Sequence, residues 1–245
     1  MNLKTLIFSK NRACQLELLL RSLGDFPTSV LYSHDPEFKT GYKKLISMYP
    51  NVDFLKETNF KQQLIDFVSI CDHILFLTDD DVTLAPFNLD TPELEVFETS
   101  KDTASLSLSL SPNIASTKWE WQKYRGNYSL RMWGYPMSID SCIFKSADIL
   151  PTIKANGVKN PNYLETNLNL NIPNKPFMMC FENPIIINNS VNQVQSDFPQ
   201  KTSGPSPLEL EQKFLSGFRI SLDDIKEKAK SRRFYRMNVN YKFEK

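Results

Sequence analysis

One stretch of the chain decides its fold: Ile74-Leu75-Phe76-Leu77-Thr78-Asp79-Asp80-Asp81-Val82. Apolar residues run directly into three consecutive carboxylates. A continuously apolar run this short predicts a strand buried on both faces, as in a parallel sheet with helices on each side. Ligands of open α/β sheets bind beyond the carboxyl ends of the strands, so the aspartates are expected at a binding site.

The three aspartates are candidates for a metal site. Side chains alternate along an extended chain, so Asp79 and Asp81 are expected to point to one side and Asp80 to the other. Two carboxylates on one side make a hard-oxygen site for Mn²⁺ or Mg²⁺ with room left for phosphate oxygens. A solvated acidic turn, or a cap for a following helix, is the alternative interpretation of the same residues.

Strand-like and helical patterns alternate before this stretch. The first eighty residues predict strands at 3–9, 29–33, 52–55 and 74–77, separated by helices at 13–23, 42–48 and 60–70. This alternation favours a Rossmann-like, mostly parallel sheet layered with helices.

The second half of the chain is less regular. Its patterns predict a helix opened by an Asp90–Glu93 capping box, strands at 104–110, 135–145, 177–180 and 184–187, a helix from Asn162, a helix opened by a Ser206–Glu209 capping box and a last helix after Ser221. We expect one catalytic domain at 1–200, with halves at 1–111 and 112–200, and a basic helical extension at 201–245.

Composition fits a globular chain of ordinary polarity. Of 245 residues, 41% are hydrophobic and 23% are charged, and no apolar run approaches the ~20 residues that span a bilayer. The four cysteines are widely scattered and form no C-x-x-C pair, which is typical of a reducing cytoplasm. We therefore expect a cytoplasmic protein.

The end of the chain is strongly basic. From Lys226 onward eight Lys or Arg residues stand against two Glu. Such a tail suits an anionic partner, and peripheral contact with the inner face of a membrane is the expectation, whereas nucleic acid is not expected. A solvated helix face is the alternative.

Several enzyme classes lack their sequence motifs here. Only seven glycines occur, and none stands in G-x-G-x-x-G or P-loop spacing. The two histidines, His34 and His73, exclude H-E-x-x-H and the zinc-deaminase signature. The G-x-S-x-G elbow of serine hydrolases is also missing. If this sheet binds a nucleotide, a metal and side chains must meet the diphosphate charge.

The strand ends together resemble those of GT-A glycosyltransferases of the family-2 type. The resemblance rests on Phe8-Ser9-Lys10-Asn11-Arg12 after the first strand, Asp35 after the second and Asp79-Asp80-Asp81 after the fourth, and it covers roughly residues 3–187 in order of elements. It implies a nucleotide-sugar donor and a D-x-D motif that carries Mn²⁺ or Mg²⁺.

The resemblance also assigns roles to individual residues. Asn11 has a simpler alternative role as a helix cap, and Asp35-Pro36 as a turn. The implied set has base and ribose contacts at Ser9, Asn11, Arg12 and Asp35, a base or diphosphate contact at Lys61, donor contacts at Asp79 and Asp80, and metal ligands at Asp79 and Asp81.

A catalytic base is implied near the acceptor, at a helix start in the second half. Glu165 matches the family's Glu-Asp position, although Thr166 replaces the usual second acid. Glu165 also completes an Asn-x-x-Glu capping box, which is a structural role, and Asp140 is the rival base. Trp119, Trp121 and Trp133 are candidates for stacking on acceptor sugar rings or for core packing.

These features predict a metal-dependent, inverting transfer of a sugar to a carbohydrate or lipid-linked acceptor, in glycan or cell-surface polysaccharide synthesis. The alternatives are a sugar-phosphate nucleotidyltransferase, whose glycine-rich N-terminal loop is missing, and a non-catalytic module that binds carbohydrate or nucleic acid.

Overall fold

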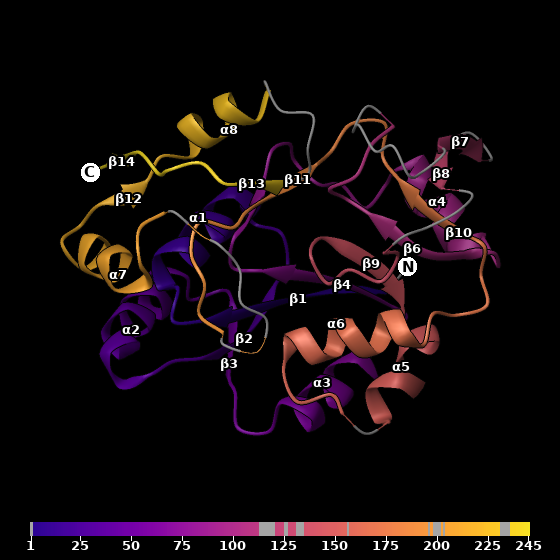
Figure 1. Cartoon of the computed structure of the whole chain (residues 1–245), viewed down its shortest axis with the longest axis horizontal. Helices are drawn as coiled ribbons and strands as arrows, with labels where there is room; N and C mark the ends of the chain where they lie inside the picture. The colour runs from indigo at the N-terminus through magenta and orange to yellow at the C-terminus, as the bar shows by residue number, and fades with distance from the viewer. Residues whose placement is uncertain are drawn as a thin grey trace.

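A computed structural model of the protein describes residues 2–112, 121–124, 127–130, 135–155, 157–195, 197, 202, 204–230 and 236–245. Its centre is a nine-stranded sheet with helices on both faces (Figure 1). The predicted α/β fold class is thereby confirmed. The side chains of residues 121–130 and the tryptophans at 119 and 133 lie outside the described part, so the stacking proposed for the three tryptophans stays a prediction.

The large sheet has the strand order β3-β2-β1-β4-β9-β6-β10-β8-β7. Among these strands only β8 and β9 run against the rest. The bounds are β1 (Leu3–Lys10), β2 (Ser29–Ser33), β3 (Asp53–Lys56), β4 (His73–Thr78), β6 (Thr103–Ser107), β7 (Trp121–Tyr124), β8 (Asn127–Leu130), β9 (Cys142–Lys145) and β10 (Phe177–Cys180).

The helices fall into two groups, one on each face. Figure 1 shows α3, α5 and α6 together, away from α1, α2 and α7. The bounds are α1 (Ala13–Leu23), a 3-10 turn (Pro36–Phe38), α2 (Lys39–Met48), α3 (Phe60–Val68), α4 (Pro92–Thr99), α5 (Ser146–Lys154), α6 (Pro161–Leu170), α7 (Pro207–Leu215) and α8 (Leu222–Lys230).

Strand β4 lies between two hydrophobic cores. Leu75 and Leu77 pack into the core that holds α1, α2 and α7, whereas Ile74 and Phe76 pack into the core that holds α3, α5 and α6. All four side chains are fully buried. The apolar run therefore has the two-sided burial that its sequence predicts, and its carboxyl end is held rigidly from both faces.

The C-terminal extension is built into the first half of the chain. Helix α7 packs on α1 and α2. Strand β13 (Arg236–Met237) pairs with β11 (Ile186–Asn189), which pairs with β5 (Asp81–Thr83), so the end of the chain joins a small sheet that begins at Asp81. A second small sheet is made by β12 (Arg219–Ile220) and β14 (Phe243–Glu244).

A buried acid ties the extension to α1. Glu17 accepts from Arg21 at 3.1 Å and lies 3.5 Å from Arg219 of β12. Because Glu17 is buried, these two arginines are its compensation. Among the helices that the structure describes, none combines the length and apolar character that a membrane crossing demands.

The caps and bounds of some elements differ from the prediction. The Ser206–Glu209 capping box forms as expected, but Thr91 rather than Asp90 caps α4 and accepts from the Leu94 amide. The strand expected at 135–145 is formed only by its last four residues, since the chain turns before it and Ser141 takes a left-handed φ of 62°. Helix α5 was not predicted.

Candidate functional site

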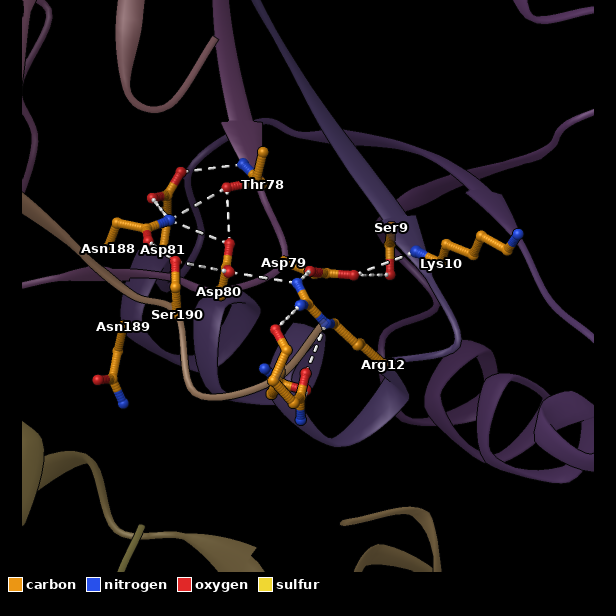
Figure 2. Close-up of polar contacts among 12 residues, drawn as sticks. Ser9, Lys10, Arg12, Thr78, Asp79, Asp80, Asp81, Asn188, Asn189 and Ser190 are labelled. Carbon is orange, nitrogen blue, oxygen red and sulfur yellow. Dashed lines mark hydrogen bonds and ion pairs between the residues drawn. The ribbon is translucent and has the colours of Figure 1, made fainter. Parts of the chain in front are cut away.

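Polar side chains gather where β1, β2 and β4 end. The strands are parallel neighbours, so their carboxyl ends lie at one edge of the sheet. The first two aspartates form a tight turn after β4, and the third opens β5. The side chains of this turn are shown in Figure 2. Asp79, Asp80 and Asp81 are 3%, 8% and 0% exposed, so the cluster is not a solvated acidic turn.

Because residues 79–80 turn, the strand alternation expected for the aspartates does not hold. Asp79 and Asp80 share one partner instead of facing opposite ways. Arg12 Nη1 lies 2.9 Å from Oδ1 of Asp79 and 3.2 Å from Oδ2 of Asp80 (Figure 2). The Ser9 hydroxyl and the Lys10 amide donate to the other oxygen of Asp79, at 2.9 and 3.1 Å.

A second bridge joins Asp80 to Asp81. The Asn188 amide group donates to Oδ1 of each, at 3.0 and 3.1 Å. Ser190 donates to Asp80 at 3.2 Å, and the Thr78 amide donates to Asp81 at 2.9 Å. Each neighbouring pair of aspartates thus shares one donor, which is charged in the first case and neutral in the second.

The three carboxyl groups differ in their protonation. Burial raises the pKa of Asp79 to about 6, against the opposing effect of Arg12. Burial also acts to raise the pKa of Asp80, but Arg12 and hydrogen bonds from Thr78 and Asn188 outweigh it, and the pKa is lowered. For Asp81, burial, Asp140 and Asp80 all raise the pKa, well above the ordinary value. Burial and like-charged neighbours therefore favour the protonated form of Asp81.

Two predicted nucleotide contacts form a pair of their own. The Asn11 side chain donates to Oδ2 of Asp35 at 2.6 Å and accepts from the Asp35 amide at 2.8 Å. Asn11 takes a left-handed φ of 56°, which asparagine tolerates. It does not cap a helix, because α1 has Arg12 at its N-cap. The pair joins the ends of β1 and β2.

Lys61 is not brought to this group. Its ammonium donates to the carbonyl oxygen of Ala155 at 2.6 Å, next to the end of α5. Ser9, by contrast, lies within the group, 2.9 Å from Asp79 and 2.6 Å from the hydroxyl of Tyr42.

The two candidate bases lie beside the aspartates. The Thr78 hydroxyl is 2.9 Å from Oδ1 of Asp80 and 3.2 Å from Oδ1 of Asp140. Burial and then Asp140 raise the pKa of Glu165. The charge of Asp140 also raises the pKa of Asp81, so we describe Asp81, Asp140 and Glu165 as one acidic row that starts at the end of β4.

Glu165 does not cap its own helix. Asn160 caps α6 through the Tyr163 amide, so the predicted Asn162–Glu165 box is absent. Oε1 of Glu165 instead accepts from the Ser138 hydroxyl at 2.9 Å and the Ile139 amide at 3.0 Å. These contacts hold the carboxylate toward the segment that carries Asp140.

The sequence has a relative among characterised proteins. No family model matches the chain. The bifunctional glycosyltransferase pgtA of Dictyostelium discoideum is 25% identical over 299 aligned residues, which take in 98% of this chain and 39% of the relative. This chain resembles a glycosyltransferase. It spans about two fifths of the length of the relative that it matches.

Solved structures give weaker likenesses. S. aureus TarS 1-349 in complex with UDP-GlcNAc has a TM-score of 0.44 at 14% identity, over 75% of this chain and 56% of that chain. A cytidylyltransferase from Leptospira borgpetersenii has a TM-score of 0.43 at 14% identity, over 69% of this chain and 70% of that chain. Both scores are below 0.5, so no functional argument rests on them.

The glycosyltransferase resemblance implies a divalent cation, and Asp81 suits one better than Asp79, because the donors to Asp81, Asn188 and the Thr78 amide, are neutral. Both oxygens of Asp79 accept from Arg12, Ser9 or the Lys10 amide. Within the described residues, no group of three or more His, Cys, Asp or Glu side chains is arranged to hold a metal. Mg²⁺ commonly needs only one or two carboxylates together with substrate phosphates. Asp81 and its neighbour Asp140, whose charge contributes to the raised pKa of Asp81, supply two carboxyl groups.

Sequence reasoning missed several residues of this site: Tyr42, Thr78, Asn188, Ser190 and Asn192. Asn188 and Ser190 come directly after the apolar run 185–187, which is the same signal that pointed to the aspartates. Arg12 and Asn192 are 180 positions apart in the chain, and no local sequence pattern predicts their contact.

Proposed function

We propose that this chain transfers a sugar from a nucleotide-sugar donor to a hydroxyl group of a carbohydrate or lipid-linked acceptor. The observation that carries the proposal is the acidic row of Asp81, Asp140 and Glu165, which begins where β4 ends and continues to α6. The Asn11–Asp35 pair at the neighbouring strand ends supports a nucleotide site beside the row. The similarity to a glycosyltransferase points to the same chemistry.

Glu165 is the proposed base. It takes the proton of the acceptor hydroxyl while the oxygen forms a bond to the anomeric carbon, and the bond from that carbon to the diphosphate oxygen breaks. The diphosphate leaves with the electron pair. A base works best with a pKa near the working pH, and burial beside Asp140 moves Glu165 in that direction. A single displacement of this kind inverts the anomeric carbon.

Asp81 and Asp140 would hold Mn²⁺ or Mg²⁺. When bound, the cation supplies positive charge against the leaving diphosphate. Asp79 and Asp80 are not proposed as metal ligands, because their charges are already paired with Arg12.

The surroundings of the acceptor are also proposed. Tyr135 stands beside Glu165 and is 43% exposed, so its ring suits contact with a sugar face. An acceptor that belongs to a cell-surface polysaccharide would bring the enzyme to a membrane, where the basic residues after Lys226 suit an anionic surface.

A thermal-shift panel of nucleotide sugars, with and without Mn²⁺, tests the proposal. A ligand present at ~100 times its dissociation constant stabilises the fold by roughly 2.7 kcal/mol, or several degrees for a chain of this size. We expect one nucleotide class to raise the melting temperature, and more so with Mn²⁺. No shift with any nucleotide sugar at millimolar concentration would contradict the proposal.

A further inference from the structure

Arg12 is a nearly buried cation in the middle of the site. Its side chain is 9% exposed, and it stands at the N-cap of α1 directly after β1. Nη1 donates to Asp79 and Asp80, at 2.9 and 3.2 Å. Nε donates to Oδ1 of Asn192 at 2.9 Å, and Nη2 donates to the Asn192 carbonyl oxygen.

These contacts leave the guanidinium little capacity for a ligand. Arginine has five N–H donors, and four of them are directed at the aspartates and Asn192. A group that bound a donor diphosphate would have to leave two buried carboxylates without their cation. Such a step is costly, because a buried charge without a partner is strongly unfavourable.

Asn192 fixes the position of the guanidinium from the other half of the chain. It lies between β11 and α7, and its side-chain amide donates to the Pro205 carbonyl oxygen at 2.9 Å. The backbone amide of Arg12 donates to the Tyr42 hydroxyl at 3.3 Å. Arg12 is therefore held at both ends: its backbone by Tyr42 of α2, and its guanidinium by the segment that leads into α7.

We propose that Arg12 is the resident counter-ion of the Asp79–Asp80 turn and a positioning residue, and that it does not contact the donor. It holds the turn so that the chain enters β5 with Asp81 facing Asp140. Only this last step rests on the proposed function. Asp81 accepts instead from the neutral amide of Asn188. In the described structure it is the one aspartate of the triplet that does not pair with an arginine.

A double-mutant cycle in the full chain without nucleotide tests the pairing. Arg12→Met leaves two buried carboxylates uncompensated, so we expect the melting temperature to fall by roughly 6–20 °C. Asp79→Asn changes it much less, since Asp80 still pairs with Arg12. The double variant should melt higher than Arg12→Met alone. Equal effects of Asp79→Asn in both backgrounds would overturn the proposal.

Two further variants distinguish the specific role of the Arg12 guanidinium from a general effect of losing an arginine. Arg12→Lys keeps the charge but loses the fork, so it should recover only part of the melting temperature lost in Arg12→Met. Arg219→Met, at a position 47% exposed, is the matched control for losing an arginine and should show no rescue by Asp79→Asn. If Arg12→Met does not fold, folding of the double variant supports the proposal, and its failure to fold as well contradicts it.

Nucleotide affinity separates a positioning role from direct contact. The dissociation constant of the nucleotide that stabilises the wild type should agree within about 2-fold between Asp79→Asn and the double variant, because Arg12 makes no contact with the donor in this proposal. A 10-fold weaker affinity in the double variant would make Arg12 a donor ligand and overturn the proposal. If no nucleotide binds the wild type, the proposed function fails, and the stability cycle still decides the pairing of Arg12.

Discussion

The three consecutive aspartates lie in two regions that differ in the charges around the carboxyl groups. Asp79 and Asp80 share the charge of Arg12, whereas Asp81 faces Asp140 and Asp80. The first region is a turn whose carboxylates are paired with Arg12, and the second is a group of neighbouring acids in which burial and like charges raise the pKa of Asp81 and Glu165. Three consecutive identical residues therefore take different roles because of their partners, and chemistry is expected in the second region.

The largest expected effect is on the base at the far end of the second region. Glu165→Gln keeps the shape and the contacts to residues 138 and 139 but removes proton acceptance. Turnover should fall by roughly 10²–10⁴-fold, the usual contribution of general base catalysis. Donor affinity with Mn²⁺ should be unchanged. Steady-state kinetics and titration of the donor measure the two quantities.

Asp140→Asn is the control for Glu165. If Glu165→Gln retains near-normal turnover while Asp140→Asn loses it, the base is Asp140.

A smaller loss is expected at the start of the second region. Asp81→Asn should remain folded and lower turnover by roughly 10²–10³-fold, as is typical when one electrostatic contact to the reacting charge is removed. EDTA should have a similar effect on the wild type. Asp79→Asn sharpens the comparison, because its position in the compensated turn predicts a loss below about 10-fold. Equal losses at both positions would remove the distinction between the regions.

In the first region, we expect Asp79 to change how the free energy of unfolding depends on pH. The pKa of Asp79 is raised to about 6 in the fold, so this group stabilises the protein at pH 4 and the contribution is lost as the pH rises through 6. Asp79→Asn should show a weaker decline in unfolding free energy between pH 4 and 7 than the wild type. Urea denaturation at several pH values measures it.

Asp80→Asn provides the contrast within the pair. The pKa of Asp80 is lowered, so its contribution is lost only as the pH falls below about 4. Its substitution should therefore change the decline between pH 4 and 7 less than Asp79→Asn does, and only through the loss of the Asp80 charge that helps to raise the pKa of Asp79. A decline altered by Asp80→Asn and not by Asp79→Asn would contradict the assignment.

The smallest effect is expected far from both regions, at the basic end of the chain. In the described part of this run, Lys228 pairs with Asp224 at 2.5 Å and Lys230 with Glu227 at 2.7 Å, which reduces the free charge. Residues 231–235 lie outside the described structure. At ~1 kcal/mol for each unpaired basic residue, binding to anionic vesicles should be weak and steeply reduced by salt. Equal binding to neutral vesicles would exclude the electrostatic contact.

Local patterns in the sequence predict the elements of the sheet better than they predict the site. The strand at 29–33 and the helix at 13–23 have the expected bounds, because apolar periodicity follows directly from burial on a strand or a helix. Helix α5 was missed, since Pro151 lies within it and proline is unusual in a helix interior.

The site depends on contacts that the local sequence does not carry. Alternation predicts that Asp79 and Asp81 share one side, but the chain turns at 79–80 and Arg12 takes the first two aspartates. Glu165 has the spacing of a capping residue, yet it bonds across to Ser138 and Ile139. In both cases a partner from another element overrides the local preference.

Release of the nucleoside diphosphate from a nucleotide sugar by the purified chain most directly tests the proposed sugar transfer and the proposed role of Asp81. We expect release in Mn²⁺ by the wild type and by Asp79→Asn, and its loss in EDTA and in Asp81→Asn. Undiminished release by Asp81→Asn, or no release by the wild type from any nucleotide sugar with or without an acceptor glycan, would contradict it.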